Sequence, residues 1–377
     1  MKRNNVDIVD LSVGEPDFST PFHIKQAAIQ AIQSNFTKYT LNNGLIELRQ
    51  AIVQKLKKDN HLDYDIDEII VSNGAKQCIF NVVLSLINPG DEVLIPNPYW
   101  ISHPEIVNLA EGRPVFIPTR EENGYKLTGS QLQDYFTPHT KLLILCNPNN
   151  PTGSVYSKDE LEELASVIEK TETYLIADEI YEKLIYDQGN FMSCAAISPR
   201  MKERTVIVNG VSKAYAMTGW RIGYAAGNKD LISAAAKIQS HSTTNASSIS
   251  QFASLEALTG PQDAIEKMRL EFENRRNFVF KKLNDINGIT CPKPMGAFYV
   301  FPNVSFYYGK KYKNYNIEDS NTLAEYLLHD TNVAVIPGAA FGSDNHIRLS
   351  YTTSMENLRK GMERLQEGLA RLKPGDG

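Results

Sequence analysis

The sequence predicts an α/β protein in which helices cover both faces of a parallel sheet. Between about residues 69 and 227, short apolar runs alternate with helical patterns. Most of these runs are apolar throughout, as in strands that are buried on both sides. After Gly260 the pattern changes to a long charged helix followed by short strands. With a length of 377 residues, this change indicates about two domains.

The elements follow from the chain in order. The first 20 residues or so are expected to form an extended arm, because Pro16 and Pro21 interrupt regular structure. Helices are predicted at 22–34, 45–60, 75–88, 158–170, 230–239, 247–258 and 262–286. Strands are predicted at 69–74, 93–98, 141–148, 174–181, 204–210, 220–227, 296–304, 332–338 and 346–352.

The last helix carries an apolar stripe at alternating spacings of three and four residues, from Met355 to Leu372. A coiled-coil seam is one interpretation, but the stripe runs for less than three heptads. A helix packed on a sheet is the simpler prediction.

Composition excludes several classes of function. The net charge is −5 and basic residues form no block, so nucleic acid is not an expected partner. No apolar run reaches the roughly 18 residues of a membrane span, and the N-terminus lacks the apolar core of a signal peptide. The four cysteines are scattered, which argues against a metal site or a disulfide framework. We therefore expect a cytoplasmic protein in which the cysteines are small buried hydrophobic residues.

Lys213 lies in the segment 211–214, between two predicted apolar strands. Taken alone it would be a surface loop lysine. Ser212 precedes it, however, and Arg221 follows eight residues later. A hydroxyl and a guanidinium suit a phosphate monoester. A Schiff-base lysine needs a partly desolvated site, in which its amine is free near neutral pH. The context favours such a lysine next to a phosphate site.

Asp178 closes the apolar run at 174–181, and Tyr181 follows it. A carboxylate at the C-terminal edge of a parallel strand lies where such sheets bind ligands. It could keep a pyridine nitrogen protonated by raising the pKa of that nitrogen. The alternatives are a helix cap or loop ion pair for Asp178 and ordinary packing for Tyr181.

Three weaker signals accompany those at Lys213 and Asp178. Asn150 lies in a proline-rich turn and could donate a hydrogen bond to a phenolic oxygen. Ala75 and Lys76 follow Gly74 at the start of a helix, where free backbone N–H groups favour a phosphate. Arg348 alternates with apolar residues on a late strand and would suit a substrate carboxylate. Each signal alone is equally typical of a turn, a helix start or a surface arginine.

Together these segments resemble the class I and II aminotransferases of pyridoxal-phosphate fold type I, above all the prokaryotic aspartate aminotransferase subgroup. The matching stretches cover nearly the whole chain, in the expected order: VGEPDF, TKYTLNNGLIELR, GDEVLIPNPYW, NPNNPTG, ADEIY, SKAYAMTGWRIGY, GAFYVF and IRLSY. The resemblance implies a large cofactor-binding domain at 36–265, with a mainly parallel seven-stranded sheet. A smaller α+β domain would be formed by the N-terminal arm (1–35) and by residues 266–377.

The resemblance also implies roles around pyridoxal 5′-phosphate. Lys213 would hold the cofactor as a Schiff base and later move the proton. Asp178 would pair with the pyridine nitrogen, while Asn150 and Tyr181 would bind the O3′ oxygen. Trp100 would stack on the ring and border the substrate.

Further roles concern the phosphate and the assembly. Ser212, Arg221 and the amides of Ala75 and Lys76 would hold the phosphate. Tyr39 would reach the phosphate of a neighbouring subunit, which implies a homodimer with shared active sites.

The substrates implied are an L-amino acid and a 2-oxo acid, which react in a ping-pong transamination. Arg348, Asn150 and the Gly14 backbone would bind the α-carboxylate, and Lys76 would face the distal carboxylate of aspartate or glutamate. The acceptor would be an oxo acid such as 2-oxoglutarate.

Alternatives remain open at this stage. They are an aminotransferase for aromatic or other amino acids, a β-lyase or synthase on the same fold, and a non-catalytic regulator that binds the cofactor. His103 and Ser12 depart from the subgroup pattern, which often has tyrosine and threonine there. We expect both near the pocket for the substrate side chain.

Overall fold

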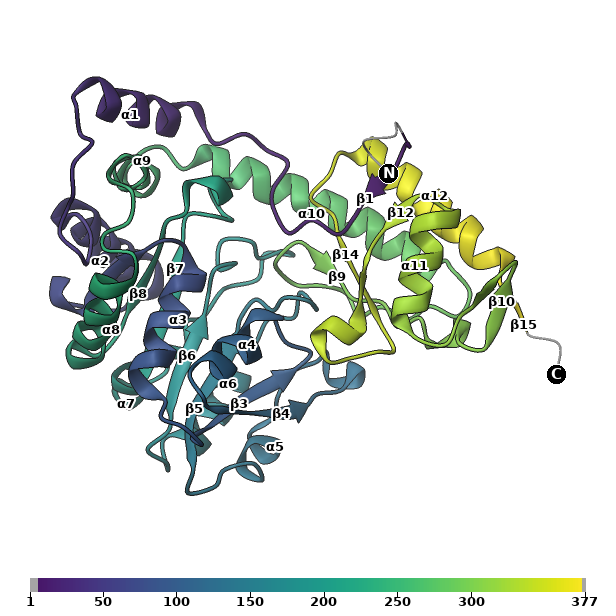
Figure 1. The fold of residues 1–377 in the computed structure, drawn as a ribbon, viewed down its shortest axis with the longest axis horizontal. Helices are drawn as coiled ribbons and strands as arrows, with labels where there is room; N and C mark the ends of the chain where they lie inside the picture. The colour runs from purple at the N-terminus through teal and green to yellow at the C-terminus, as the bar shows by residue number, and fades with distance from the viewer. Residues whose placement is uncertain (1–5, 375–377) are drawn as a thin grey trace.

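Seven strands form the central sheet of the computed structural model, which describes residues 6–374 (Figure 1). In spatial order they are β2 (Ile69–Ser72), β8 (Gly223–Ala226), β7 (Thr205–Gly210), β6 (Tyr174–Asp178), β5 (Thr140–Cys146), β3 (Glu92–Asn97) and β4 (Arg113–Pro118). The pairs from β7 to β4 are all parallel, whereas β8 is antiparallel to both of its neighbours. The predicted α/β class with a mainly parallel sheet is confirmed.

The strand that departs from the parallel arrangement is β8. Residues 211–222 connect β7 to β8 without a crossover helix. A parallel pair needs such a crossover, whereas a short connection suits an antiparallel pair. The predicted strand at 220–227 also begins later, at Gly223, because Thr218–Trp220 form a 3₁₀ turn and Arg221 has a φ of 57°.

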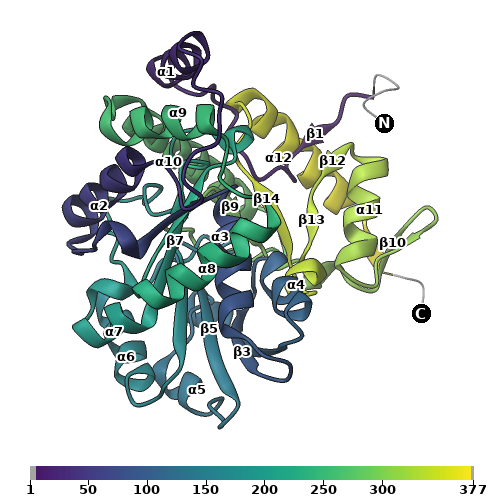
Figure 2. The same cartoon turned by 60° about the vertical axis from the view of Figure 1, so that its left-hand side comes forward.

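Helices cover both faces of the sheet (Figure 2). On one face α3 (Ala75–Leu86), α4 (Ser102–Leu109) and α8 (Lys229–Ser242) pack on alternate strand residues such as Ile144 and Val206. The intervening residues, such as Leu145 and Ile207, face the other side. That side is covered by α2 (Ile46–Asn60), α5 (Gly129–Gln133), α6 (Lys158–Ile168), α7 (Pro199–Arg204) and α9 (Ser248–Thr259). We call this unit the sheet body.

A second unit, the C-terminal body, comprises residues 285–374 and is joined to the sheet body by α10 (Asp263–Asn284) (Figure 1). It contains two helices, α11 (Ser320–Asp330) and α12 (Met355–Arg371). Its short strands are β9 (Tyr299–Val300), β10 (Lys310–Tyr312), β11 (Tyr315–Asn316), β12 (Val333–Ala334), β13 (Ile336–Pro337), β14 (Ile347–Ser350) and β15 (Lys373–Pro374).

The apolar stripe of α12 lies inside this body. Leu358, Met362, Leu365 and Leu369 are buried in its core, and the helix contacts β1 (Val9–Asp10), β12, α10 and α11. The stripe is therefore the buried face of a helix packed on strands and helices, as the simpler prediction had it.

The N-terminal arm joins the two bodies. Its strand β1 pairs in parallel with β12 of the C-terminal body, and Leu11 enters the core there. The arm then runs through residues 11–21 without regular structure and leads to α1 (Phe22–Gln33), which packs on α9 of the sheet body. The extended arm predicted from Pro16 and Pro21 is confirmed over the described residues.

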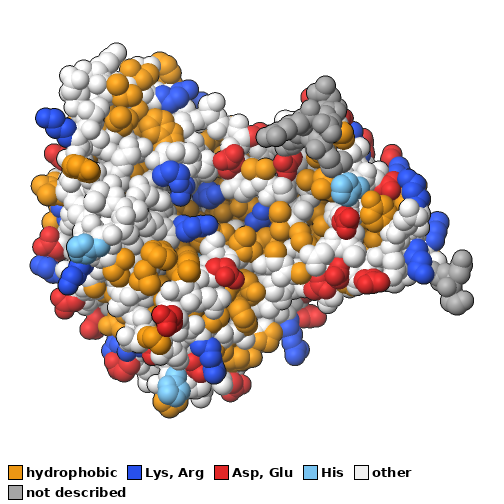
Figure 3. Space-filling view, viewed as in Figure 1, with side chains coloured by type: hydrophobic (Ala, Val, Ile, Leu, Met, Phe, Trp, Pro, Cys, Tyr) orange, Lys and Arg blue, Asp and Glu red, His pale blue; other side chains and the backbone are white. Residues whose placement is uncertain are grey.

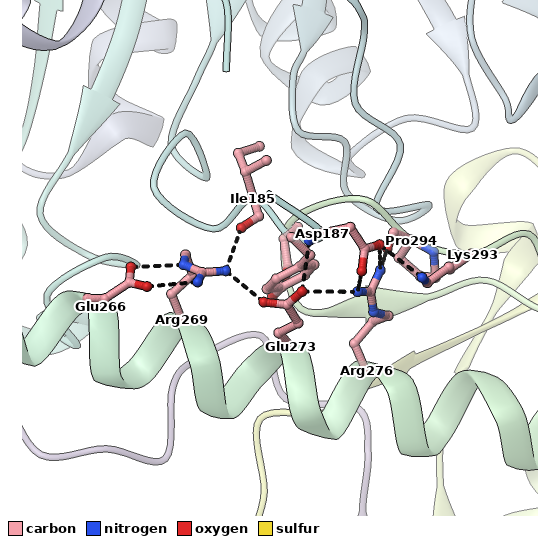
Figure 4. A network of polar contacts seen from close by, with 10 residues as sticks. Ile185, Asp187, Glu266, Arg269, Glu273, Arg276, Lys293 and Pro294 are labelled. Carbon is pink, nitrogen blue, oxygen red and sulfur yellow. Dashed lines mark hydrogen bonds and ion pairs between the residues drawn. The ribbon is translucent and has the colours of Figure 1, made fainter. Parts of the chain in front are cut away.

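A network of charged groups adds a second junction (Figure 4). Arg276 of α10 is fully buried and binds both carboxylate oxygens of Asp187, at 2.8 and 3.0 Å. It also donates to the Pro294 carbonyl at 2.5 Å, and Lys293 lies 2.9 Å from Asp187. The network thus fixes the loop after β6 and the segment before β9 onto one helix.

Within residues 6–374, no helix is both long and apolar enough to cross a membrane. All four cysteines are buried, as predicted, and each is a free thiol.

Candidate active site

A cavity of about 490 Å³ opens where the carboxyl ends of the parallel strands face the C-terminal body and the arm. Its four cationic side chains come from three segments: Lys76 from the start of α3, Lys213 and Arg221 from the β7–β8 connection, and Arg348 from β14. Basic side chains gather near the middle of the face drawn in Figure 3. Four cations converging in one hollow make it a site for an anionic ligand.

The structure brings eleven of the twelve residues predicted for the site to this cavity. They are Gly14, Ala75, Lys76, Trp100, Asn150, Asp178, Tyr181, Ser212, Lys213, Arg221 and Arg348. The individual roles given to them above stay predictions.

Lys213 lies in the β7–β8 connection, at the floor of the cavity. Its amine donates to the Gly14 carbonyl at 2.5 Å and lies over the rings of Phe298 and Tyr181, at 5.5 and 5.8 Å from their centroids. Burial, followed by the nearby Arg348 guanidinium, lowers the pKa of the amine to about 8. A lysine with this pKa has a sizeable neutral fraction near physiological pH and can act as a nucleophile or a base.

Asp178 ends β6 at the cavity and is 4% exposed. One carboxylate oxygen accepts from the Ile180 amide at 3.4 Å, and the other lies 3.4 Å from Nε2 of His103. His103 is 1% exposed and meets Trp100 edge-on, with ring centroids 5.2 Å apart. His103 therefore lies next to two lining residues, Asp178 and Trp100, although its own ring is not part of the cavity wall. Its expected place near the substrate side-chain pocket stays a prediction.

The start of α3 faces the cavity next to Arg221. The first amides of a helix, here those of Ala75 and Lys76, have no partner within the helix. Gly74 has a φ of 87°, and a Cβ there would lie 2.3 Å from the Arg221 guanidinium. A Cβ on Gly223 would lie 2.2 Å from the Ala75 amide nitrogen. Two glycines thus allow a helix start, a strand and an arginine to meet around one small volume.

Arg348 extends from β14 on the opposite side of the cavity. Its guanidinium donates to Oδ1 of Asn150 at 3.1 Å and to the Ser12 carbonyl at 2.8 Å. It also lies over the rings of Tyr299 and Phe341, at 4.4 and 4.9 Å. Among the residues that the structure describes, its Nε has no hydrogen-bond partner. A buried guanidinium with an unused donor is suited to a carboxylate.

Ser12 contributes to the site through its backbone. Its hydroxyl donates to Asp10 at 2.6 Å, and its carbonyl accepts from Arg348. The side chain therefore does not line the cavity, although the expected proximity to the site is correct.

Aromatic groups form two further walls. The Tyr181 hydroxyl lies 3.0 Å from that of Tyr299, and burial raises the pKa of Tyr181 well above its usual value. Across the cavity, the Lys76 amine lies 5.0 Å from the centroid of the Trp100 ring. This cation–π contact holds the amine at the cavity wall.

Tyr39 is the one predicted site residue that lies outside the cavity of its own chain. Its side chain is 88% exposed. The exposure leaves the hydroxyl free for a neighbouring molecule, but the proposed contact with a second subunit stays a prediction.

Several lining residues had no role assigned from the sequence. They are Val13, Glu15, Ile101, Cys146, Ile180, Thr218 and Tyr299. Glu15 accepts from the Thr218 hydroxyl at 2.8 Å, which fastens the arm to the β7–β8 connection. Glu15, Thr218 and Tyr299 all lie in the stretches VGEPDF, SKAYAMTGWRIGY and GAFYVF, so their membership in these motifs was the available signal.

Comparisons with known proteins agree with this geometry. Residues 6–365 match the family described as aminotransferase class I and II. The probable aspartate/prephenate aminotransferase of Rickettsia bellii is 49% identical, over 96% of this chain and 91% of that protein. The aspartate aminotransferase of Bacillus sp. (strain YM-2) is 46% identical over the same shares. The crystal structure of the aspartate aminotransferase from Rhizobium meliloti superposes with a TM-score of 0.96 and 44% identity, covering 99% of this chain and 94% of that one.

Proposed function

Because this chain belongs to the class I and II aminotransferase family, we propose that its amino donor is aspartate or a similar dicarboxylic amino acid and that 2-oxoglutarate is a suitable acceptor. The protein is a pyridoxal 5′-phosphate-dependent transaminase. The roles proposed for the site residues rest on the position of Lys213. Its amine lies in the same cavity as Asp178 and Arg348, and the charges of both act on it.

The cavity fits the cofactor at three points. Gly74 and Gly223 leave room beside Arg221 and the first amides of α3, where a phosphate gains both free N–H groups and the positive end of the helix dipole. Asp178 offers a buried carboxylate for a protonated ring nitrogen. Lys213 offers an amine with a lowered pKa to the aldehyde carbon.

When bound, pyridoxal phosphate supplies an electron sink that stabilises negative charge on the substrate Cα. The chain positions the reaction around it. Ser212 and Arg221 would anchor the phosphate, while Asn150 and Tyr181 would orient the phenolic oxygen. The Lys213 amine would take the proton from the substrate Cα and return it to the other reacting carbon, so that one group serves as base and then as acid.

The substrate would bind between Arg348 of β14 and Lys76 at the start of α3. Arg348 would bind the α-carboxylate through its guanidinium, with Asn150 fixing its orientation. The distal carboxylate would meet Lys76, which the Trp100 ring holds at the cavity wall. Two cations on different sides of the cavity favour a dicarboxylic donor over a neutral one.

The test is spectroscopic. The purified holoenzyme should be yellow, and aspartate or glutamate without an oxo acid should bleach it in a half-reaction. Lys213→Ala should abolish turnover while the fold survives, because the amine adds little to the core. Near-normal transamination by Lys213→Ala would refute the assignment. Release of pyruvate from a donor without any acceptor would instead indicate a β-lyase.

A second acceptor is suggested by the apolar rim of the cavity. Val13 and Ile101 line it with side chains that are 39% and 46% exposed, next to the Trp100 ring. Such a rim would accept a ring-bearing 2-oxo acid whose carboxylate reaches Lys76. The Rickettsia bellii relative is named for prephenate as well as aspartate. Amino-group transfer from glutamate to prephenate, followed by mass spectrometry, tests this second substrate.

We also infer a homodimer with shared sites. Six large side chains on α1, α2 and the segment between them are more than 40% exposed: Phe22, Ile29, Ile32, Tyr39, Leu41 and Ile46. Exposed apolar surface of this extent is typical of an interface. A mixture of two inactive variants tests directly whether the two subunits share their active sites. A hybrid of Lys213→Ala and Tyr39→Ala subunits regains activity only if one site takes its lysine from one chain and its tyrosine from the other.

A further inference from the structure

The active site is divided between two bodies, and the inference drawn from this division rests on the proposed function. Lys213 belongs to the sheet body, whereas Arg348 belongs to the C-terminal body. A substrate whose carboxylate binds at Arg348 and whose Cα lies at Lys213 depends on the relative placement of the two bodies. Groups that set this placement affect substrate binding without touching the substrate.

One buried contact between the bodies lies next to the strand of Arg348. His346 is 6% exposed, and its Nε2 is hydrogen-bonded to the Tyr125 hydroxyl at 2.7 Å. Its Nδ1 is hydrogen-bonded to Oγ of Ser343 at 2.9 Å. Tyr125 is 7% exposed and lies between β4 and α5 of the sheet body. Burial lowers the pKa of His346 to about 4, so that the contact is uncharged at neutral pH.

The contact leads directly to Arg348. His346 and Arg348 are two residues apart on extended backbone, and side chains at this spacing share a face. The His346 ring stacks on Phe301, with centroids 4.7 Å apart and an interplanar angle of 7°. Phe301 meets Phe341 edge-on, and Phe341 lies beneath the Arg348 guanidinium. Phe301 and Phe341 therefore form one continuous aromatic layer. It supports the side chains of both His346 and Arg348.

Two features indicate that the segment around Tyr125 is a specific contact between the two bodies. Its Glu121 accepts from Thr290 at 2.7 Å and from Asn303 at 3.4 Å, both in the C-terminal body. Tyr125 itself has a φ of 57°, in the left-handed region that residues other than glycine seldom adopt. Backbone of this kind persists only where the surroundings hold it, and it concentrates at functional positions.

We propose that Tyr125 and His346 are positioning residues for transamination, because their hydrogen bond holds β14 against the segment 119–128 and so places Arg348 at the distance that the bound substrate requires. Neither side chain touches the reacting atoms. The bond acts through Arg348, on the binding of the carboxylate.

The test compares Tyr125→Phe with Tyr326→Phe in the holoenzyme. Tyr326 is fully buried, and its hydroxyl donates to the Gly368 carbonyl at 2.8 Å, so that its loss removes one hydrogen bond inside the C-terminal body alone. The probe is maleate, a dicarboxylate without an amino group, whose affinity is measured by calorimetry. Tyr125→Phe should weaken maleate about fivefold, the factor that corresponds to one net hydrogen bond, while Tyr326→Phe leaves it unchanged.

Kinetics with aspartate supply a second readout. Tyr125→Phe should raise KM by a similar factor while kcat stays within about twofold, since the bond acts on carboxylate binding. His346→Asn should have little further effect in the Tyr125→Phe background, because both changes break the same bond.

Two results would overturn the proposal. One is equal maleate affinity in Tyr125→Phe and Tyr326→Phe, and the other is a fall in kcat for Tyr125→Phe with KM unchanged. Failure of the unmodified protein to transaminate aspartate would instead count against the proposed function, since maleate binding does not depend on turnover.

Discussion

At the scale of single residues, the amine of Lys213 is subject to opposed influences. Burial and the guanidinium of Arg348 favour its neutral form, whereas the carboxylates of Glu15 and Asp178 favour the charged form. Burial dominates, and the pKa falls from 10.5 to about 8. The charges around the cavity thus tune a residue whose type alone says nothing about its reactivity.

This balance predicts a pH dependence for the cofactor-free protein. As pH rises through about 8, Lys213 loses its proton and becomes nucleophilic. Its acetylation by acetic anhydride, followed by mass spectrometry, should therefore rise with pH and reach half of its maximum near pH 8. Lys158, whose side chain is 62% exposed, serves as the control. A half-maximum near pH 10 for Lys213, as in free lysine, would contradict the lowered pKa.

In the proposed function, Lys76 sets the specificity for the amino donor. A cation at the start of α3 opposes the helix dipole, which favours negative charge there. Its contact with Trp100 offsets part of this cost and directs the amine to the cavity. Lys76→Ala should raise KM for aspartate by an amount equivalent to about 1–3 kcal/mol, and much less for an aromatic or aliphatic donor. Equal changes for all donors would remove Lys76 from the specificity argument.

At the scale of elements, the antiparallel strand β8 brings together the residues to which we assign the phosphate. Because β8 returns directly from β7, the 12 residues between the two strands form a loop at the sheet edge, which carries Ser212, Lys213 and Arg221. Gly223 then lets the start of α3 approach β8. A crossover helix in this place would have moved Lys213 and Arg221 apart.

Gly223→Ala tests this close approach. The added Cβ would lie 2.2 Å from the Ala75 nitrogen and 2.4 Å from the Gly74 carbonyl carbon, so the helix start must shift. We expect the dissociation constant of pyridoxal phosphate, from fluorescence titration, to rise by on the order of tenfold, equivalent to about 1.4 kcal/mol. Gly219→Ala is the matched control, because a Cβ there meets nothing within 4 Å. Similar affinities for both variants would show that the approach does not matter for binding.

At the scale of the whole molecule, α10 and its ion pairs unite the two bodies (Figure 4). Arg276 ties Asp187, in the loop that follows Tyr181, to the segment that leads to Tyr299. The Gly153 carbonyl, close to Asn150, accepts from the amides of Met295 and Gly296 in the same segment. The segments next to three cavity residues, Tyr181, Tyr299 and Asn150, are therefore held in place by contacts outside the cavity.

Arg276→Met should destabilise the protein by about 1.5–3 kcal/mol, because it removes the hydrogen bonds of a buried guanidinium to Asp187 and to the Pro294 carbonyl. Lys293 still pairs with Asp187 in this variant. Arg269→Met on the same helix is the comparison. Its side chain is 20% exposed and pairs with Glu266 and Glu273, which are 59% and 20% exposed, so that we expect a smaller loss than for the fully buried Arg276. Urea unfolding followed by circular dichroism measures both. A smaller effect for Arg276→Met than for Arg269→Met would contradict the role of the buried network.

The sequence by itself determined those helices and strands that have a clear hydrophobic pattern over a few residues. Continuous apolar runs predicted six strands of the sheet, because strands buried on both faces need no polar alternation. It did not predict β4, whose segment Arg113–Pro118 includes two prolines and exposed positions at the sheet edge, or α11 and the shorter helices α4, α5 and α7. The family motifs indicated which residues gather at the site, and eleven of the twelve line one cavity.

Only the tertiary structure decided the relations between segments far apart in the chain. The direction of β8, the place of His103 behind Asp178, and the contact of Tyr125 with His346 across 221 residues of sequence all depend on which surfaces meet. The pKa of Lys213 is of the same kind, because burial and the charges of Arg348, Glu15, Asp178 and Arg221 converge on it from different elements. Hydrophobic periodicity acts over a few residues, whereas burial and electrostatic interaction act through space, and these arise only once the chain has folded.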